Sequence, residues 1–338
     1  MNFSNKYFYF IIVLVLVLSS CIKDVDITAP GQETTIVYGM LDIKNTKHFL
    51  RIQKAFLDKN QSALVMAKET DSIYYPNILD VKITDLANGN TYTLNRFYGD
   101  TAGILKDTGI FSSSPNILYT FDASLNKDHR YILKVRNTNT NNEAEAQINI
   151  ANIPKIQFPI SNIEIGIVDT VPYTIKWQSA PYGITYDLVV RFNYSEKNLT
   201  TGAVTNKVYE YAAFRGASGS NLSGGETIEK KIIKSEIYKR LASSLQVNNN
   251  LERTIDPSNT LEFVIYVAGD EYDKYIQIKN AQGGITSVNF LPTYTNINNG
   301  LGLLSSRTFV KADRIRINQI SRDSLSYGIY TKDLNFTP

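Results

Sequence analysis

The chain has 338 residues, with 35 lysines and arginines against 32 aspartates and glutamates, 43% hydrophobic residues and a single cysteine. This length leaves room for two domains, each large enough to bury a core of its own. One cysteine excludes a disulfide framework, and the hydrophobic content excludes an intrinsically disordered polymer. A formal net charge of +3 is too small for a protein that binds nucleic acid by neutralising phosphates. We therefore expect a globular protein.

The amino terminus has the pattern of a bacterial lipoprotein signal peptide. Residues 7–18 (YFYFIIVLVLVL) are apolar and uncharged, and as a helix they would span only about 18 Å of the roughly 30 Å hydrocarbon layer. This length favours a signal peptide over residues 1–20. The residues that follow resemble the lipobox, in which a lipidated cysteine becomes the first residue of the mature chain: Leu18, Ser19, Ser20 and Cys21. The resemblance implies a membrane anchor at Cys21, which two or three acyl chains would make permanent; the alternative is an ordinary signal peptide followed by a buried cysteine.

Residues 21–30 are expected to form a tether between the lipid and the first domain. Three charged residues follow the cysteine closely: Lys23, Asp24 and Asp26. This pattern resembles the export signal of Bacteroidota-type lipoproteins, and implies an outer-membrane protein displayed on the cell surface. The alternative is a solvated spacer in a protein that faces the periplasm. Pro30 and Gly31 indicate the end of the tether, because both residue types interrupt helices and strands.

From residue 31 to residue 152 the sequence predicts a β-sandwich. Short segments rich in β-branched and aromatic residues predict strands over 34–41, 49–52, 81–84, 91–94 and 131–135. Asn88 and Gly89 lie between two of these segments and predict a tight hairpin. Such spacing without helical periodicity is typical of antiparallel, immunoglobulin-like or fibronectin-like sandwiches. Pro154 indicates the boundary with a second domain, because proline cannot donate a hydrogen bond to a sheet.

Residues 153–338 predict a second, similar domain with an inserted helix. Strands are expected over 173–177, 184–193 and 261–268, and the single tryptophan, Trp177, is interpreted as a core residue. Isoleucines and leucines recur near every fourth position after residue 228, which predicts a helix over about 228–246. A short helix is expected over 270–279. The fold class is thus mainly β, with two antiparallel sandwich-like domains.

The carboxy-terminal tail carries a second resemblance. The segments 292–297 (PTYTNI), 299–303 (NGLGL), 305–307 (SSR) and 323–336 are similar to a family of Bacteroidota-type outer-membrane lipoproteins. The domain of that family has no known function, and its genes often lie beside those of TonB-dependent transporters. The glycines at 300 and 302 are interpreted as structural, because the third glycine of a dinucleotide fingerprint is missing. We expect residues 292–338 to belong to the core of the second domain, with residues 31–152 able to fold alone.

The sequence contains no strong signal for catalysis, a cofactor or a metal. His48 and His129 are the only histidines, and they are interpreted as structural, because a zinc site would need both of them together and the chain has no further imidazole and only one thiol. Asp270, Glu271 and Asp273 lack the order of a calcium loop and favour the start of a helix. A catalytic pair of carboxylates, as in glycosidases, remains an alternative, because the fold and not the spacing in the sequence brings such a pair together.

Three functions follow as hypotheses. The first is a non-catalytic binding or accessory lipoprotein that works with a TonB-dependent transporter and takes a glycan or peptide ligand. Tyrosine suits such ligands because its apolar ring carries a polar tip, and the candidate ligand-binding aromatics are Tyr182, Tyr209 and Tyr211. The alternatives are a structural or adhesive surface protein and a carbohydrate-active enzyme.

Overall fold

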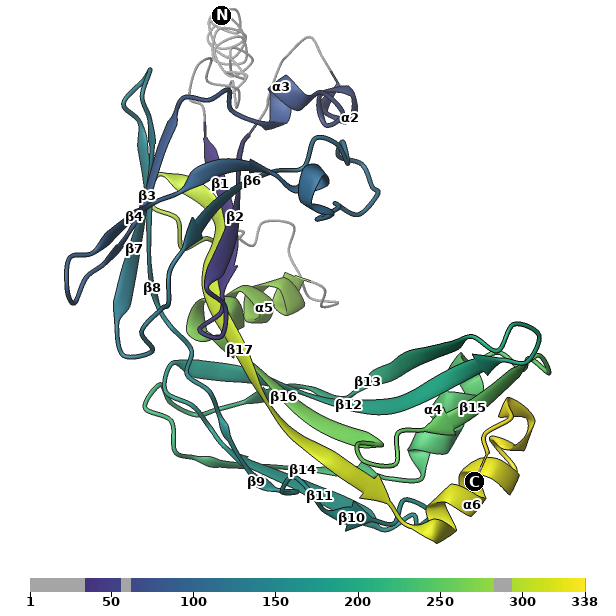
Figure 1. Cartoon of the computed structure of the whole chain (residues 1–338). Coiled ribbons are helices and arrows are strands. Elements are labelled where there is room, and N and C mark those ends of the chain that lie inside the picture. Colours follow the sequence, from purple (N-terminus) through teal and green to yellow (C-terminus); the bar gives the residue numbers. More distant parts are fainter. Residues whose placement is uncertain (1–33, 56–61, 283–293, 338) are drawn as a thin grey trace, which may run out of the picture.

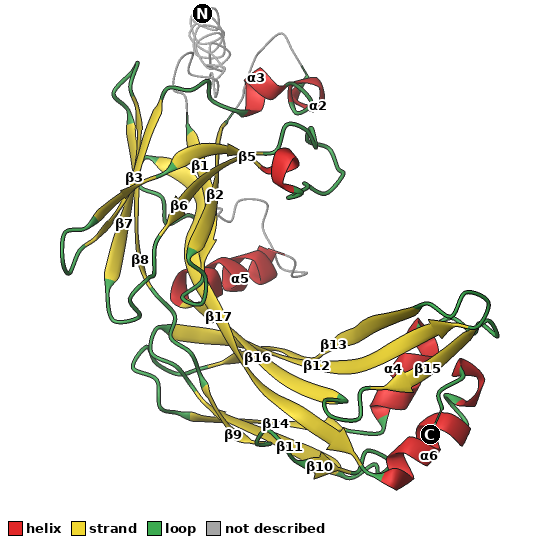
Figure 2. Ribbon diagram, in the orientation of Figure 1, coloured by secondary structure: helices red, strands yellow, loops and turns green. Residues whose placement is uncertain are grey.

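The computed structural model of the protein describes residues 34–55, 62–282 and 294–337 (Figures 1 and 2). The strands are β1 (Thr35–Leu41), β2 (Lys47–Lys54), β3 (Leu79–Asp85), β4 (Thr91–Thr93), β5 (Asn95–Tyr98), β6 (Ile117–Asp122), β7 (Arg130–Asn137), β8 (Glu143–Asn149), β9 (Lys155–Phe158), β10 (Glu164–Ile165), β11 (Pro172–Gln178), β12 (Gly183–Asn198), β13 (Val204–Ser218), β14 (Thr227–Ile233), β15 (Leu251–Ile255), β16 (Leu261–Gly269) and β17 (Gly300–Ile317). The helices are α2 (Ala63–Met66), α3 (Thr70–Ile73), α4 (Glu236–Ser244), α5 (Asp270–Gln282) and α6 (Gln319–Tyr327), with 3₁₀ turns η1 (Gly99–Ala102) and η2 (Lys332–Leu334). The protein is mainly β, as predicted.

The first sandwich packs the sheet β4-β3-β7-β8 against β1, β2, β6 and β5. Its core is formed by inward-facing side chains of both sheets, among them Leu50, Ile83 and Leu133, which are fully buried. The predicted hairpin is confirmed: β3 pairs with β4, and Gly89 between them has a φ of +77°. Glycine adopts this left-handed conformation without the steric cost that a Cβ would add.

The second sandwich packs β13, β12, β16 and β17 against the smaller sheet β14-β11-β9. The alternation that predicted the strand over 184–193 continues through β12, where Tyr186, Leu188, Val190 and Phe192 are buried and the residues between them are not. Trp177 is fully buried, as predicted, and its ring centroid lies 5.9 Å from that of Tyr186 in the facing sheet. The helices α4 and α6 cover the far end of this sandwich (Figure 2).

The strand β17 joins the two sandwiches (Figure 1). Its first residues, 300–306, pair in parallel with β1, and its later residues, 307–315, pair with β16. Ile297 and Leu304 accordingly belong to the first core, whereas Ile315 and Ile317 belong to the second. The tail is thus integral to the second core, but the first sandwich also takes in tail residues beyond the expected boundary at residue 152.

The predicted helix over about 228–246 is wrong in its first half. Residues 227–233 form β14, which pairs with β11 over its whole length, and only Glu236–Ser244 are helical. Ile228 and Ile232 face the core with Lys230 between them on the same face, and the ammonium of Lys230 lies 4.1 Å from the ring centroid of Phe214. A lysine whose stem covers apolar surface hides the alternation that would have indicated a strand. The predicted short helix after residue 269 is confirmed as α5.

The predicted signal peptide and tether lie outside the described residues. Within the described ranges, none of the helices has the length and apolar character that crossing a bilayer requires.

Candidate functional site

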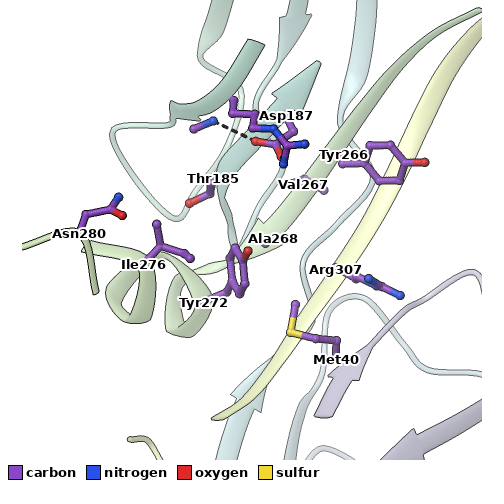
Figure 3. A pocket seen from close by; sticks show the side chains of 12 residues that line it. Met40, Thr185, Asp187, Tyr266, Val267, Ala268, Tyr272, Ile276, Asn280 and Arg307 are labelled. Atoms are coloured by element: carbon purple, nitrogen blue, oxygen red, sulfur yellow. Dashed lines mark hydrogen bonds and ion pairs between the residues drawn. The ribbon is translucent and has the colours of Figure 1, made fainter. Parts of the chain in front are cut away.

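A cavity of about 500 Å³ lies where β17 passes from one sandwich to the other (Figure 3). The sheet of the second sandwich forms its floor, α5 forms one wall, and Met40 of β1 closes it from the first sandwich. The side chains that line it are Met40, Thr185, Asp187, Arg215, Tyr266, Val267, Ala268, Tyr272, Ile276, Asn280 and Arg307. Its wall is mostly apolar, with a few polar groups directed into it, as is typical of small-molecule sites.

The wall formed by α5 is fixed by its own first turn. Asp270, Glu271 and Asp273 stand at the helix start, where carboxylates favour the positive end of the helix dipole. The Asp273 carboxylate accepts a hydrogen bond of 2.6 Å from the hydroxyl of Thr185 on β12. The backbone N–H of Tyr272 donates to the hydroxyl of Ser305 on β17 at 3.2 Å. The helix is therefore attached to both strands, and it presents Tyr272 and Ile276 to the cavity (Figure 3).

Two arginines give the cavity an incompletely neutralised positive charge. The guanidinium of Arg215 lies 3.8 Å from the carboxylate of Asp187, and its side chain is 77% exposed. The same carboxylate already accepts a hydrogen bond from the backbone N–H of Gly216. The guanidinium of Arg307, on β17, forms no hydrogen bond or ion pair with any described residue. An arginine presents five donors in a planar fork that matches carboxylates and phosphates.

The neighbouring charges on the same sheet face are, in contrast, fully paired. Arg191 donates to Glu210 at 3.0 Å and to the hydroxyl of Tyr266 at 2.7 Å. Lys311 contacts the Glu262 carboxylate at 2.8 Å. Burial raises the pKa of Glu262, but hydrogen bonds from Lys311 and Asn259 and the positive charges of Lys311 and Arg191 together lower it by more, so that the net pKa lies below its ordinary value. Among the described residues that line the cavity, Arg307 is thus the cation without an ion pair, and Arg215 is the one with a loose, exposed pair.

The predicted aromatic site is not assembled. Tyr209 and Tyr211 lie on β13 with ring centroids 6.1 Å apart, and α4 covers them: the guanidinium of Arg240 lies 4.4 Å from the ring of Tyr211. Burial raises the pKa of Tyr211 to about 12. Tyr182 precedes β12, whereas Tyr211 pairs with Val190, eight residues further along that strand, or roughly 26 Å away. Tyr209 and Tyr211 therefore pack, and they do not form one binding surface with Tyr182.

The remaining predicted residues divide into two groups. The lipobox residues Leu18, Ser19, Ser20 and Cys21 and the charged residues Lys23, Asp24 and Asp26 lie outside the described residues. The histidines lie in the first sandwich: His48 is buried with Nε2 3.0 Å from the Ala123 carbonyl, and Nδ1 of His129 lies 2.7 Å from the Asp85 carboxylate. Among the described residues no three histidine, cysteine, aspartate or glutamate side chains are grouped to hold a metal.

The cavity residues were missed by sequence reasoning for a physical reason. Arg307 lies in the tail segment 305–307 and Tyr272 on the predicted short helix, but nothing in either pattern indicates that they line one cavity. Their proximity depends on the long-range pairing of β17 with both β1 and β16. Only the grouping of an arginine, a tyrosine and apolar residues around one hollow makes them a site, and that arrangement suits binding.

The comparisons with known proteins add little. No protein-family model matches the chain. No curated protein matches it either. Among solved structures, the C-terminal globular domain of an oligosaccharyltransferase from Pyrococcus abyssi is 10% identical with a TM-score of 0.24, over 63% of this chain and 40% of that one. The calcium-binding domain CBD12 of CALX1.1 is 10% identical with a TM-score of 0.15, over 84% of this chain and 99% of that one. At such scores neither likeness carries an argument.

Proposed function

We propose that the protein is a non-catalytic binding lipoprotein of the outer membrane, whose cavity takes a small ligand with one anionic group and one apolar part. The observation that carries this proposal is Arg307, which lines the cavity and whose guanidinium has no partner among the described residues. Tyr272, Ile276 and Met40 supply the apolar contacts. A carboxylate paired with Arg307 would form charge-assisted hydrogen bonds, which are shorter and stronger than neutral ones.

The location rests on the sequence patterns. The lipobox over Leu18–Cys21 supports a lipid anchor, and Lys23, Asp24 and Asp26 support display on the cell surface. The tail segments around Gly300–Leu303 support a role beside a TonB-dependent transporter, because the family that they resemble is often encoded next to one. In this role the protein would hold a ligand at the membrane and pass it to the transporter.

The binding proposal is tested with a matched pair of ligands. The mature chain, residues 21–338, is titrated with 4-phenylbutyrate and with the neutral amide of the same acid, and binding is followed by ligand-observed NMR. The acid should bind more tightly than the amide, and Arg307→Gln should weaken acid binding by about ten- to a hundredfold, the range expected for one hydrogen bond to a charged group. Arg316→Gln is the control, since it removes an exposed arginine from the same strand away from the cavity. Equal effects of the two substitutions would contradict the proposal.

The partner is tested separately. The tagged, lipidated protein is purified from outer membranes in detergent, and the proteins that co-elute are identified. A TonB-dependent transporter should be enriched over the sample in which Cys21→Ala releases the protein from the membrane. If no transporter is enriched, the transporter is removed from the proposal as a partner. The binding function is then decided by the titration alone.

A further inference from the structure

The first sandwich exposes a group of aliphatic side chains at one end. The exposed fractions are 62% for Leu64, 50% for Val65, 77% for Leu105 and 61% for Ile110. We call these four residues the α2 patch. Single exposed aliphatic residues are common on soluble proteins, but grouped ones mark a surface that contacts a protein or a membrane.

The α2 patch is held in place by the segments that carry it. The backbone N–H of Ser112 donates to the Ala67 carbonyl at 2.9 Å, which joins the segment after η1 to the end of α2. The ammonium of Lys106 donates to the Ser112 carbonyl and lies 5.4 Å from the ring centroid of Phe111. Met66 and Ala67 are buried, so α2 is seated on the sandwich with Leu64 and Val65 turned outward. The packing of this end of the first sandwich therefore keeps the side chains of the α2 patch exposed.

The patch lies at the end of the molecule where the described chain begins. The hydroxyl of Thr35, the first residue of β1, lies 2.9 Å from that of Tyr75, just after α3. Figure 1 shows α2, α3 and the segment after η1 at the same end as the start of β1, away from α6. Twelve residues, 22–33, separate Cys21 from Thr34, and even a fully extended chain of this length reaches only about 40 Å.

From this placement we propose that the α2 patch rests on the bilayer surface to which the protein is anchored. The inference rests on the proposed lipid anchor at Cys21. An anchor within about 40 Å gives a surface patch an effective concentration at the membrane in the millimolar range, so that a weak apolar contact suffices. Leu64, Val65, Leu105 and Ile110 would enter the boundary between headgroups and acyl chains. The contact fixes one orientation of the molecule, with the second sandwich directed away from the membrane.

The test uses the single native tryptophan and the single cysteine. The mature chain is coupled through the Cys21 thiol to a maleimide lipid in vesicles of phosphatidylethanolamine with a minor share of phosphatidylglycerol, so that the tether exists whatever happens in the cell. Leu105→Trp places a reporter in the patch, and Ile329→Trp places one at an 80% exposed position next to α6, at the other end of the molecule. Trp177, which is fully buried, supplies the common background.

The Leu105→Trp emission should shift to the blue and be quenched at least twofold by bromine-labelled lipids, while the emission of Ile329→Trp and of the parent chain should not change. Adding Leu64→Asp and Ile110→Asp to Leu105→Trp should abolish the quenching. Quenching no greater at position 105 than at position 329 would overturn the inference and assign the patch to another partner. Membrane fractionation of Cys21→Ala in cells tests the lipid anchor independently, so a failure of the anchor and a failure of the patch give different results.

Discussion

Gly302 of β17 lies directly against the backbone of Val37 in β1, and a Cβ on Gly302 would overlap the Val37 carbonyl oxygen. Gly302 also has a φ of +110°, a conformation that residues with a side chain rarely adopt. The two residues are partners in the parallel register through which the tail enters the first sandwich. The interpretation of this glycine as structural is thus confirmed, and its role is to let two backbones approach.

Gly302→Ala should lower the free energy of unfolding by about 2 to 5 kcal/mol, because backbone strain and overpacking act together. Chemical denaturation followed by circular dichroism measures the change. Gly109→Ala is the control: its Cβ would meet no atom within 4 Å, so its effect should stay within about 0.5 kcal/mol. Equal effects of both substitutions would mean that the close approach of β17 to β1 is not maintained in solution.

Two positions on β17 should report on different sandwiches. Leu304 and Ile315 are both fully buried, the first in the core of the first sandwich and the second in that of the second. Replacing either by alanine should cost about 2 to 5 kcal/mol. Hydrogen exchange should show the loss of protection over residues 35–54 for Leu304→Ala and over residues 183–198 for Ile315→Ala. Loss of protection over residues 35–54 in both variants would show that the two sandwiches unfold as one unit.

The sequence contained the local features of the fold but not the pairing that joins its parts. Alternation predicted the strand over 184–193 and turn chemistry predicted the hairpin at Gly89, because both depend on neighbouring residues. Local pattern misled at residues 227–233, where isoleucines four apart fit a helix and a strand equally and Lys230 occupies a core-facing position. The entry of β17 into the first sandwich involves residues more than 250 positions apart in the chain, and nothing local specifies such a contact.

The candidate site shows the same limit more strongly. Arg307 stands between two polar residues, Ser306 and Thr308, and Tyr272 lies on one side of the predicted helix with Tyr275 and Ile276, so neither pattern indicates a ligand. Their common cavity exists because α5 is attached to β12 through Thr185 and to β17 through Ser305. Conversely, the residues chosen for their chemistry, Tyr209 and Tyr211, serve packing under α4.

The Asp85–His129 contact predicts a dependence of stability on pH. Burial raises the pKa of the Asp85 carboxyl, but hydrogen bonds from His129, from the backbone N–H of Ala87 and from Asn88, with the charge of His129, together lower it by more, so the net pKa lies below 3.8. The charged carboxylate therefore stabilises the folded state above the unfolded pKa of about 3.9, and this contribution is lost as the pH falls through the folded pKa.

Asp85→Asn should accordingly lower the free energy of unfolding by about 1 to 3 kcal/mol at neutral pH. The difference from the parent protein should shrink as the pH falls below about 4, where the parent carboxyl is also neutral. Denaturant titrations at a series of pH values measure both effects. Asp80→Asn removes a solvent-accessible partner of Lys82 and should change stability by less than about 1 kcal/mol. A difference for Asp85→Asn that stays constant with pH would contradict the assignment.

Trp177 and Tyr186 offer the last prediction, because they touch in one core and differ in how their polar atoms are satisfied. The indole N–H of Trp177 is buried with no hydrogen-bond partner among the described residues. The hydroxyl of Tyr186 accepts from the backbone N–H of Ala180 at 2.8 Å and donates to the Gly183 carbonyl at 3.0 Å. Trp177→Phe thus removes an unsatisfied donor together with some apolar volume, whereas Tyr186→Phe leaves a buried N–H without its acceptor.

An unsatisfied buried polar group costs about 1 to 3 kcal/mol, which Trp177→Phe recovers and Tyr186→Phe introduces. Tyr186→Phe should therefore destabilise the second sandwich at least as much as Trp177→Phe, although it deletes a single oxygen atom. Trp177→Ala, which leaves a cavity, should cost about 3 to 5 kcal/mol. Far-UV circular dichroism during denaturation serves for all three variants, since two of them lack the only tryptophan. If Trp177→Phe proved clearly more costly than Tyr186→Phe, the indole N–H would have to be hydrogen-bonded in solution, and the packing of this core would need to be revised around that bond.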